Sequence, residues 1–235
     1  MKKKTIIGCV AVSLGFISAL WLCIGALFAP APVFSQAETP MKIVVDAGHG
    51  GIDGGVTGKK TGVKESDLNL QIAYRVKDVL QDKGFEVVLT RKTEGGLYGV
   101  ATKGFKRRDM EARKSIIQQE KPSYILSLHQ NFYPSKTPRG AQVFFNPQSP
   151  THQAFATCIQ TELNKLYAKE NVKARKESKG EFYMLNCAEV PSALIECGFL
   201  SNEKDEKLLL SAAWQTQLAN AIATGVIRFL SESAT

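Results

Sequence analysis

Residues 42–51, KIVVDAGHGG, decide the fold of this protein. The first half of the stretch, KIVVD, is a short apolar run rich in β-branched side chains, which predicts a buried strand. The second half opens a glycine-rich loop that contains His49 and continues to Gly62. Buried strands of this kind are typical of parallel sheets, in which ligands bind beyond the carboxyl ends of the strands. We therefore expect the chemistry of the protein at the end of this strand.

Strand and helix patterns alternate along the rest of the chain. Further strands are predicted over residues 85–89, 124–129, 141–145 and 192–196, with a short one over residues 182–185. Helices are predicted from a cap at Ser66 or Asp67 to about residue 83, over residues 107–119 and 150–166, after a cap at Asn202, and over residues 214–229. The alternation predicts a single α/β domain, with a twisted, mostly parallel sheet of about six strands and helices on both faces.

The N-terminal segment has the pattern of an export signal. Residues 2–4 are lysines, and residues 5–29 are mostly apolar and carry no charge. Small residues at Ser35 and Ala37 offer a cleavage site, and without cleavage the apolar run is long enough to stay as a membrane anchor. The expected organisation is a signal peptide or anchor at 1–37, a linker at 38–41 and one domain at 42–235. The lysines stay inside, so this domain is exported and is either secreted or held on the outer face of the cytoplasmic membrane.

Composition and charge exclude several classes of protein. The chain has 235 residues, 44% of them hydrophobic, and a formal net charge of +8, which is too apolar and too weakly charged for a disordered protein. Setting aside the three lysines of the export segment leaves +5 for the exported part. Basic residues gather within 103–108 and within 173–179, but neither cluster forms a nucleic-acid-binding stripe. We interpret both as solvated loops; the alternative is attraction to an anionic cell-wall polymer or membrane surface.

The cysteines give no metal or disulfide pattern. Five are too few, and odd in number, for a disulfide-stapled miniprotein. The spacing of Cys158, Cys187 and Cys197 in the exported domain matches no zinc knuckle, so we interpret them as free or structural. Pairing of Cys187 with Cys197 stays open at this point.

Three predicted strands end in residues that carry chemistry. The first leads to His49, the third ends in His129-Gln-Asn131, and the last ends in Glu196. Parallel strands place these ends on one rim of the sheet, and neutral imidazole is the usual zinc ligand. A catalytic zinc site needs a third protein ligand, for which Glu65 is the candidate. Its alternative role is that of an acid favoured by the helix dipole at a helix start.

Glu196 is the second informative carboxylate. It follows the apolar residues 193–195, so its side chain should be poorly solvated. A buried carboxylate without a partner is costly, and low solvation favours a group that accepts protons. We therefore predict a general base here; the alternative is a structural salt bridge with an arginine.

The glycine loop also has a competing interpretation. Gly48-x-Gly50 after a strand is part of the dinucleotide-binding pattern. The spacing to Gly54 is wrong for that pattern, no helix follows at once, and a histidine stands in the turn. Nucleotide binding is therefore disfavoured.

Four motifs in order resemble a known family. The strings are VVDAGHGGIDGG, KESDLNL, SLHQN and ALIECGFLSN, and the resemblance to the zinc-dependent N-acetylmuramoyl-L-alanine amidases runs from about Lys42 to Leu230. It implies that His49, Glu65 and His129 hold zinc and that Glu196 is the catalytic base. The implied reaction is hydrolysis of the amide bond between N-acetylmuramic acid and L-alanine in peptidoglycan.

A narrower resemblance points to one group within the family. The segments TKGFKRR at 102–108 and GAQ at 140–142, with an N-terminal anchor, are similar to the germination-specific amidases of spore formers. In that group, removal of the peptide permits formation of muramic-δ-lactam in the spore cortex. The resemblance implies functional coupling to a muramic acid deacetylase and a location that includes the forespore intermembrane space. Since no wall-binding module is visible, we also expect an accessory protein or lipoprotein.

Substrate contacts are expected from three residues. Asn131 is a candidate for orienting the substrate, and Arg107 and Arg108 for binding its anionic groups, with solvent exposure as the alternative for the arginines. Gln130 stands where the family more often has a small or apolar residue, and we expect it to leave the metal ligands untouched. Two other functions remain open: a non-catalytic wall-binding scaffold, and a zinc peptidase that cuts within the stem peptide.

Overall fold

The computed structural model describes residues 40–135 and 137–233. The predicted signal peptide or anchor at 1–37, and the first part of the linker, lie outside these residues. Among the described helices, none combines the length and the apolar character needed to cross a bilayer.

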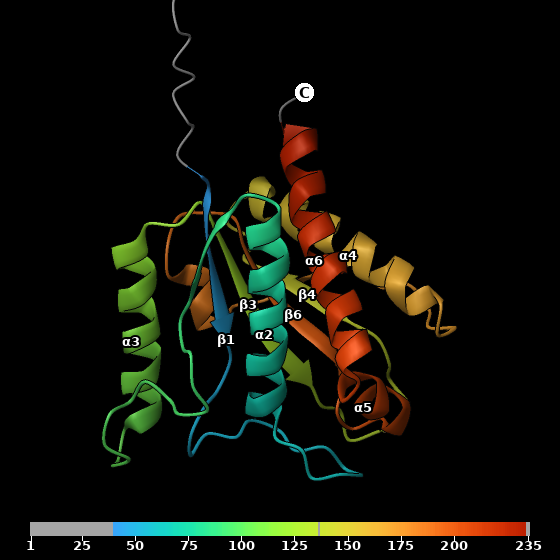
Figure 1. The fold of residues 1–235 in the computed structure, drawn as a ribbon, viewed down its shortest axis with the longest axis horizontal. Coiled ribbons are helices and arrows are strands. Elements are labelled where there is room, and N and C mark those ends of the chain that lie inside the picture. The colour runs from blue at the N-terminus through green and yellow to red at the C-terminus, as the bar shows by residue number, and fades with distance from the viewer. Residues whose placement is uncertain (1–39, 136, 234–235) are drawn as a thin grey trace, which may run out of the picture. The chain divides into compact units, whose positions relative to one another are not determined.

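A six-stranded sheet forms the centre of the domain, in the order β2-β1-β3-β6-β4-β5 (Figure 1). The strands are β1 (Lys42–Ala47), β2 (Glu86–Leu89), β3 (Tyr124–Asn131), β4 (Gln142–Phe145), β5 (Ser178–Lys179) and β6 (Ser192–Phe199). β1 pairs in parallel with β2 and β3, β3 pairs in parallel with β6, and β4 runs antiparallel to β6. The predicted mostly parallel α/β sheet is therefore confirmed.

Helices cover both faces of the sheet. They are α2 (Glu65–Asp82), α3 (Phe105–Glu120), α4 (Pro150–Ala168), α5 (Glu203–Leu209), α6 (Ala212–Ser233) and the short 3-10 helix η1 (Tyr183–Asn186). In Figure 1, α2 and α6 lie side by side in front of the sheet, with α4 against α6 and α3 apart from them. Alternation along β1 explains the two layers: Ile43 and Val45 join the large core with α2, α4 and α6, whereas Val44 packs with Ile117 of α3 and Met184 of η1.

The predicted strand over residues 182–185 is wrong. Those residues enter η1, whose Met184 and Leu185 are buried, and the edge strand is instead Ser178–Lys179 beside Phe144 and Phe145. A two-residue edge strand in a polar segment has no alternation of apolar and polar side chains to reveal it. Of the apolar residues that suggested a strand, Met184 packs against Ile117 of α3 and Leu185 is buried, whereas Phe182 and Tyr183 are exposed.

The predicted side-chain cap of α2 is also wrong. The helix begins at Glu65, one residue before the predicted caps, and no side chain caps it. Backbone contacts to the glycine loop replace the cap: the amide of Glu65 donates to the carbonyl of Val56 at 2.9 Å, and that of Ser66 to Gly54 at 3.1 Å. The start of α2 is thus joined directly to the loop that carries His49.

The three described cysteines, Cys158, Cys187 and Cys197, are free and buried. Cys197 lies in the large core, and Cys187 lies in the smaller cluster on the opposite face of the sheet. The sheet separates the two thiols, which closes the question of their pairing.

Candidate metal centre

The register of the sheet gathers the predicted site residues at one rim. Ala47 at the end of β1 is paired with Leu128, and His129 on β3 is paired directly with Glu196 on β6. Beyond β1, the amide of Gly48 donates to the carbonyl of Leu128 at 3.0 Å, which keeps the loop against β3. His129, Glu196 and the loop with His49 are therefore neighbours although they are far apart in sequence.

His49, Glu65 and His129 form a compact cluster. One ligand atom from each lies within 4.8 Å of the others. Oε1 of Glu65 is 3.3 Å from Nε2 of His49 and 3.0 Å from Nδ1 of His129, and the two imidazoles meet edge to face at 5.0 Å. Two imidazoles and one carboxylate are a ligand set that catalytic zinc uses, with a position left for water. The donor set and its spacing fit one zinc ion.

The glycines around His49 make this approach sterically possible. His49 itself has a positive φ of 61°, a left-handed conformation that is uncommon for residues other than glycine. A Cβ on Gly48 would overlap the imidazole ring of His129. The backbone can lie against that ring only because residue 48 has no side chain.

Two buried arginines hold the loop in place, and neither could be predicted from the sequence. Arg113 on α3 donates to the carbonyl oxygens of Ala47 at 2.7 Å and His49 at 2.5 Å, and to Oδ1 of Asp46 at 2.7 Å. Arg91 donates to the carbonyls of Ala47 at 2.9 Å and Gly48 at 3.1 Å. Both arginine residues are at least 98% buried, so these hydrogen bonds are shielded from water.

The charge of Arg113 is balanced by Asp46. Burial by itself would raise the pKa of the Asp46 carboxyl, but Arg113 outweighs it, together with hydrogen bonds from Thr90 and Ser127, so the pKa lies below its ordinary value. A second acid, Asp109, accepts a hydrogen bond from Nε of Arg113 at 2.6 Å. The network is therefore a buried ion pair with its hydrogen bonds satisfied, the form in which buried charges are tolerated.

Two of the three metal-ligand candidates, His49 and Glu65, are oriented by further hydrogen bonds. Nδ1 of His49 lies 3.1 Å from Oδ2 of Asp53, and the Glu65 carboxylate accepts the amides of Val56 at 2.9 Å and Gln130 at 3.0 Å. Burial would lower the pKa of His49, but Glu65 and then Asp53 outweigh it and raise the pKa to about 8. Asp53 is a positioning residue that the sequence reasoning missed, although it lies only four positions after His49 in the same motif.

Gln130 is connected to the cluster in two ways. Its backbone amide donates to Oε1 of Glu65 at 3.0 Å. Its side-chain Nε2 donates at 3.1 Å to Oδ1 of Asn69, and Nδ2 of Asn69 donates at 3.3 Å to Oε1 of Glu65. The Gln130 side chain thus contacts none of the ligand candidates directly and supports Glu65 only through Asn69.

Glu196 has the surroundings of a proton acceptor. Its Oε2 is buried and has no hydrogen-bond partner among the described residues, and no arginine or lysine of that part of the chain pairs with it. Burial raises the pKa of Glu196 to about 7, with Glu65 adding to the rise and His129 opposing it. This carboxylate oxygen lies on the strand position paired with His129 and has no partner among the described residues, so a polar group bound at the site could interact with it.

A cavity of about 230 Å³ opens in front of the cluster. It is lined by Asp46, Gly48, His49, Asp53, Tyr98, Phe105, Lys106, Asp109, Met110, Arg113, His129 and Met184. Lys106 contributes an exposed cation to this lining and pairs with Asp53, its Nζ lying 3.5 Å from Oδ1. The sequence had placed Lys106 only within a basic cluster.

The predicted substrate residues lie outside this lining. Arg107 is exposed and pairs with Glu111 at 3.3 Å, and Arg108 donates to backbone carbonyls within residues 98–103. Asn131 stands at the end of β3. Arg108 thus serves to hold the preceding loop, and substrate contacts of these three residues stay predictions.

Comparison with known proteins agrees with the motifs. Residues 43–228 match the family model described as N-acetylmuramoyl-L-alanine amidase. The germination-specific N-acetylmuramoyl-L-alanine amidase of Bacillus subtilis is 37% identical over 193 residues, which are 81% of this chain and 80% of that protein.

Solved structures give the same result. The CwlD amidase of Clostridioides difficile, in complex with the GerS lipoprotein, superposes with a TM-score of 0.77 at 34% identity, over 82% of this chain and 99% of that chain. An N-acetylmuramoyl-L-alanine amidase of Clostridium difficile 630 superposes with a TM-score of 0.71 at 26% identity, over 82% and 97% of the two chains. The resemblance seen in the sequence is confirmed.

Proposed function

The chain belongs to the N-acetylmuramoyl-L-alanine amidase family and is an amidase of peptidoglycan, and we propose that it works with a zinc ion held by His49, Glu65 and His129. The observation that carries the proposal is the cluster of these three ligand atoms within 4.8 Å beside the orphaned Oε2 of Glu196. The bond cleaved joins the lactyl group of N-acetylmuramic acid to L-alanine.

The residues of the chain divide the work of the reaction. Zinc, when bound, would lower the pKa of a water molecule and polarise the amide carbonyl. Glu196 accepts the proton of the attacking water and returns it to the departing amine of L-alanine, a role suited to a carboxylate with a pKa near 7. Asp53 keeps the His49 ring oriented, and the buried arginines keep its loop in place before substrate arrives.

We further propose a role in the spore cortex. The support is the similarity to the germination-specific amidase of Bacillus subtilis. In this role the enzyme removes peptides from muramic acid as a step toward muramic-δ-lactam, with functional coupling to a muramic acid deacetylase. The complex of the Clostridioides difficile relative with a lipoprotein supports an accessory lipoprotein partner here. The place of action would be outside the cytoplasmic membrane, reached through the N-terminal segment as a cleaved signal or an anchor.

A Glu196→Gln variant tests the mechanism. We expect turnover of purified peptidoglycan to fall by roughly a hundredfold to ten-thousandfold, because a general base is lost, with the zinc content unchanged. Glu203→Gln is the matched control, since its carboxylate is exposed and pairs with Lys60 at the surface. Wild-type turnover by the Glu196 variant, with zinc retained, would remove Glu196 from the mechanism.

Two further measurements separate the alternatives. Mass spectrometry of the products must show peptides with a free L-alanine amine; cleavage inside the peptide would instead indicate a zinc peptidase. Metal analysis of the purified protein distinguishes the enzyme from a scaffold, because a protein that takes up no zinc under any condition cannot use the His49, Glu65 and His129 cluster in this way.

A further inference from the structure

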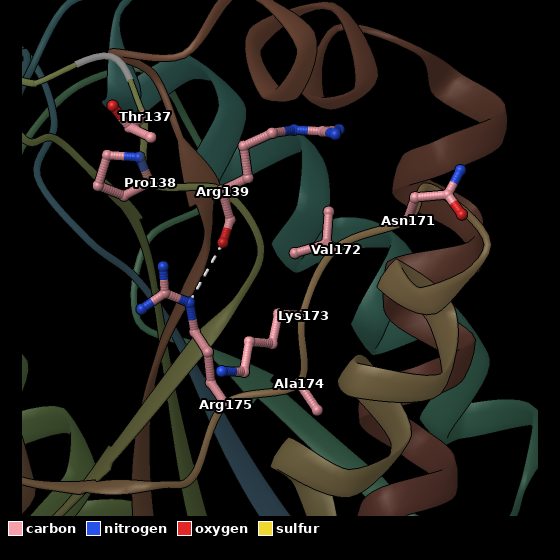
Figure 2. Close-up of a pocket in the computed structure, with 8 residues that line it drawn as sticks. All are labelled: Thr137, Pro138, Arg139, Asn171, Val172, Lys173, Ala174 and Arg175. Atoms are coloured by element: carbon pink, nitrogen blue, oxygen red, sulfur yellow. Dashed lines mark hydrogen bonds between the residues drawn. The ribbon is translucent and has the colours of Figure 1, made fainter.

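A second cavity, of about 460 Å³, lies between the loop that leads into β4 and the segment that follows α4 (Figure 2). It is lined by residues 137–139 and 171–175. Its volume falls in the range of small-ligand sites. None of the proposed catalytic residues belongs to it.

The lining of this cavity is cationic. It contains Arg139, Lys173 and Arg175 and no acidic residue. Arg139 is neutralised by Asp205, whose Oδ1 lies 2.9 Å from its Nε. In the part of the chain that the structure describes, no carboxylate lies within ion-pair distance of Lys173 or Arg175. Two positive charges therefore share the cavity without a counter-charge from the protein.

Arg175 is fixed in position. Its Nε donates to the carbonyl of Arg139 at 3.2 Å, and its guanidinium group lies over the ring of Phe199, 5.2 Å from the centroid. Asn164 makes two hydrogen bonds to the backbone of Arg175. The Arg175 amide donates to Oδ1 of Asn164 at 3.1 Å, and Nδ2 of Asn164 donates to the Arg175 carbonyl at 2.8 Å. None of the described residues accepts a hydrogen bond from Nη1 or Nη2. A guanidinium group that is held on one edge and open on the other is suited to bind a carboxylate through two parallel hydrogen bonds.

Lys173 strengthens the case for an anion. Lys173 is exposed and lines the same cavity as Arg175. Two like charges at one cavity repel, and a bound anion would relieve the repulsion. The sequence analysis interpreted residues 173–179 as a solvated basic cluster, and the structure places two of its four cations on the lining of one cavity.

The cavity is linked to the proposed catalytic rim through β6. Arg175 lies over the ring of Phe199, which is on the same strand as Glu196 and is paired with Asn131, two residues after His129 on β3. The cavity therefore lies on the side of the rim at which β6 ends.

We propose that Arg175, together with Lys173, binds a carboxylate of the peptidoglycan stem peptide, away from the bond that is cleaved. The proposal rests on the peptidoglycan amidase activity and adds to it a subsite for the anionic peptide. A stem peptide ends in a carboxylate, so the class of ligand is present on the substrate itself. The subsite would favour peptides with free carboxylates over amidated ones.

The test compares Arg175→Gln and Lys173→Gln with the wild type on soluble muropeptides, with carboxylates either free or chemically amidated. We expect KM on the free-carboxylate substrate to rise about fivefold to tenfold in Arg175→Gln and less in Lys173→Gln, with kcat within twofold. Amidation should raise KM of the wild type by the same factor and leave the Arg175 variant nearly unaffected. Lys169→Gln, an exposed lysine outside the lining, is the control and should leave KM unchanged. Because Lys173 is exposed, its variant tests the subsite even if loss of Arg175 disturbs folding.

Binding without turnover separates two kinds of failure. The same muropeptides are titrated into Glu196→Gln with and without Arg175→Gln, and an equal affinity of the two proteins would overturn the subsite. Absence of free L-alanine amines from the wild-type reaction would instead overturn the proposed function. A third outcome would also overturn the proposal. If both cavity variants kept the wild-type KM but lost binding to phosphatidylglycerol vesicles or to an acidic partner protein, the cavity would bind a different anionic ligand.

Discussion

Zinc binding should release a proton from His49. An imidazole must be neutral to bind a metal, so any proton that the zinc-free protein keeps on a ligand leaves when zinc arrives. In the structure, Glu65 and Asp53 outweigh the effect of burial and raise the pKa of His49 to about 8. The Glu65 carboxyl itself has a lowered pKa and is already ionised at neutral pH.

The size of the effect follows from the pKa. At pH 7 a group with a pKa of about 8 is roughly 90% protonated, whereas an imidazole with an ordinary pKa near 6.5 is only about 25% protonated. Zinc binding at pH 7 should therefore release about 0.9 protons from His49, and the affinity should rise nearly tenfold per pH unit up to about pH 8. The same shift acts on the zinc-free fold: the stability that His49 contributes is complete below pH 6.5 and is lost as the pH rises through about 8.

Isothermal titration calorimetry of zinc into the zinc-free protein, in two buffers with different ionisation enthalpies, measures the protons released. Glu196→Gln serves as the background, because Glu196 has a pKa of about 7 and would add its own proton. Adding Asp53→Asn removes one of the two acids that raise the pKa of His49, so the release should fall. Because a zinc-bound water would also release a proton, the change that Asp53→Asn makes is the decisive quantity, and a release unaffected by Asp53→Asn would refute the reasoning.

Three further predictions concern the parts that support the site. In Gly48→Ala, the new Cβ displaces the ring of His129, so zinc affinity measured by chelator competition should fall roughly tenfold to hundredfold, and unchanged affinity would contradict this. Arg113→Leu leaves the buried Asp46 carboxylate without its cation, so the free energy of unfolding in urea should drop by about 3–5 kcal/mol, and a loss below about 1 kcal/mol would count against the network. Burial raises the pKa of the Cys187 thiol to about 11, so iodoacetamide at pH 8 should label it only after unfolding, and rapid labelling of the folded protein would show the thiol to be accessible.

The sequence predicts the parts of this molecule that depend on local pattern. The KIVVD strand and the residues at its end were placed correctly, because a buried parallel strand needs a continuous apolar run and the loop after it needs glycine. The rim with His129 and Glu196 followed from the parallel order of the strands. The ligand role of Glu65 could be predicted only through the family motifs, since an acid at a helix start is common without any metal.

The contacts that fix the geometry could not be predicted in the same way. Arg113 stands in a mostly polar helix, and nothing in its neighbours along the chain distinguishes it from the exposed Arg107 one turn and a half before it. Its burial arises from the approach of α3 to β1, where its partners Asp46 and the carbonyl of His49 come from a segment more than sixty residues earlier. Long-range pairs of this kind have no periodic signature.

These buried arginines bear on how the metal site forms. In small zinc domains the ligands are unplaced without metal, and zinc binding drives folding. Here the carbonyls of the loop are already satisfied by Arg91 and Arg113, the start of α2 is bonded to that loop, and a large apolar core lies beneath the sheet. The cost of holding His49 at a positive φ is thus met by protein hydrogen bonds rather than by the ion. We infer that the domain folds without a metal ion and that the proposed zinc site is already formed in the folded protein.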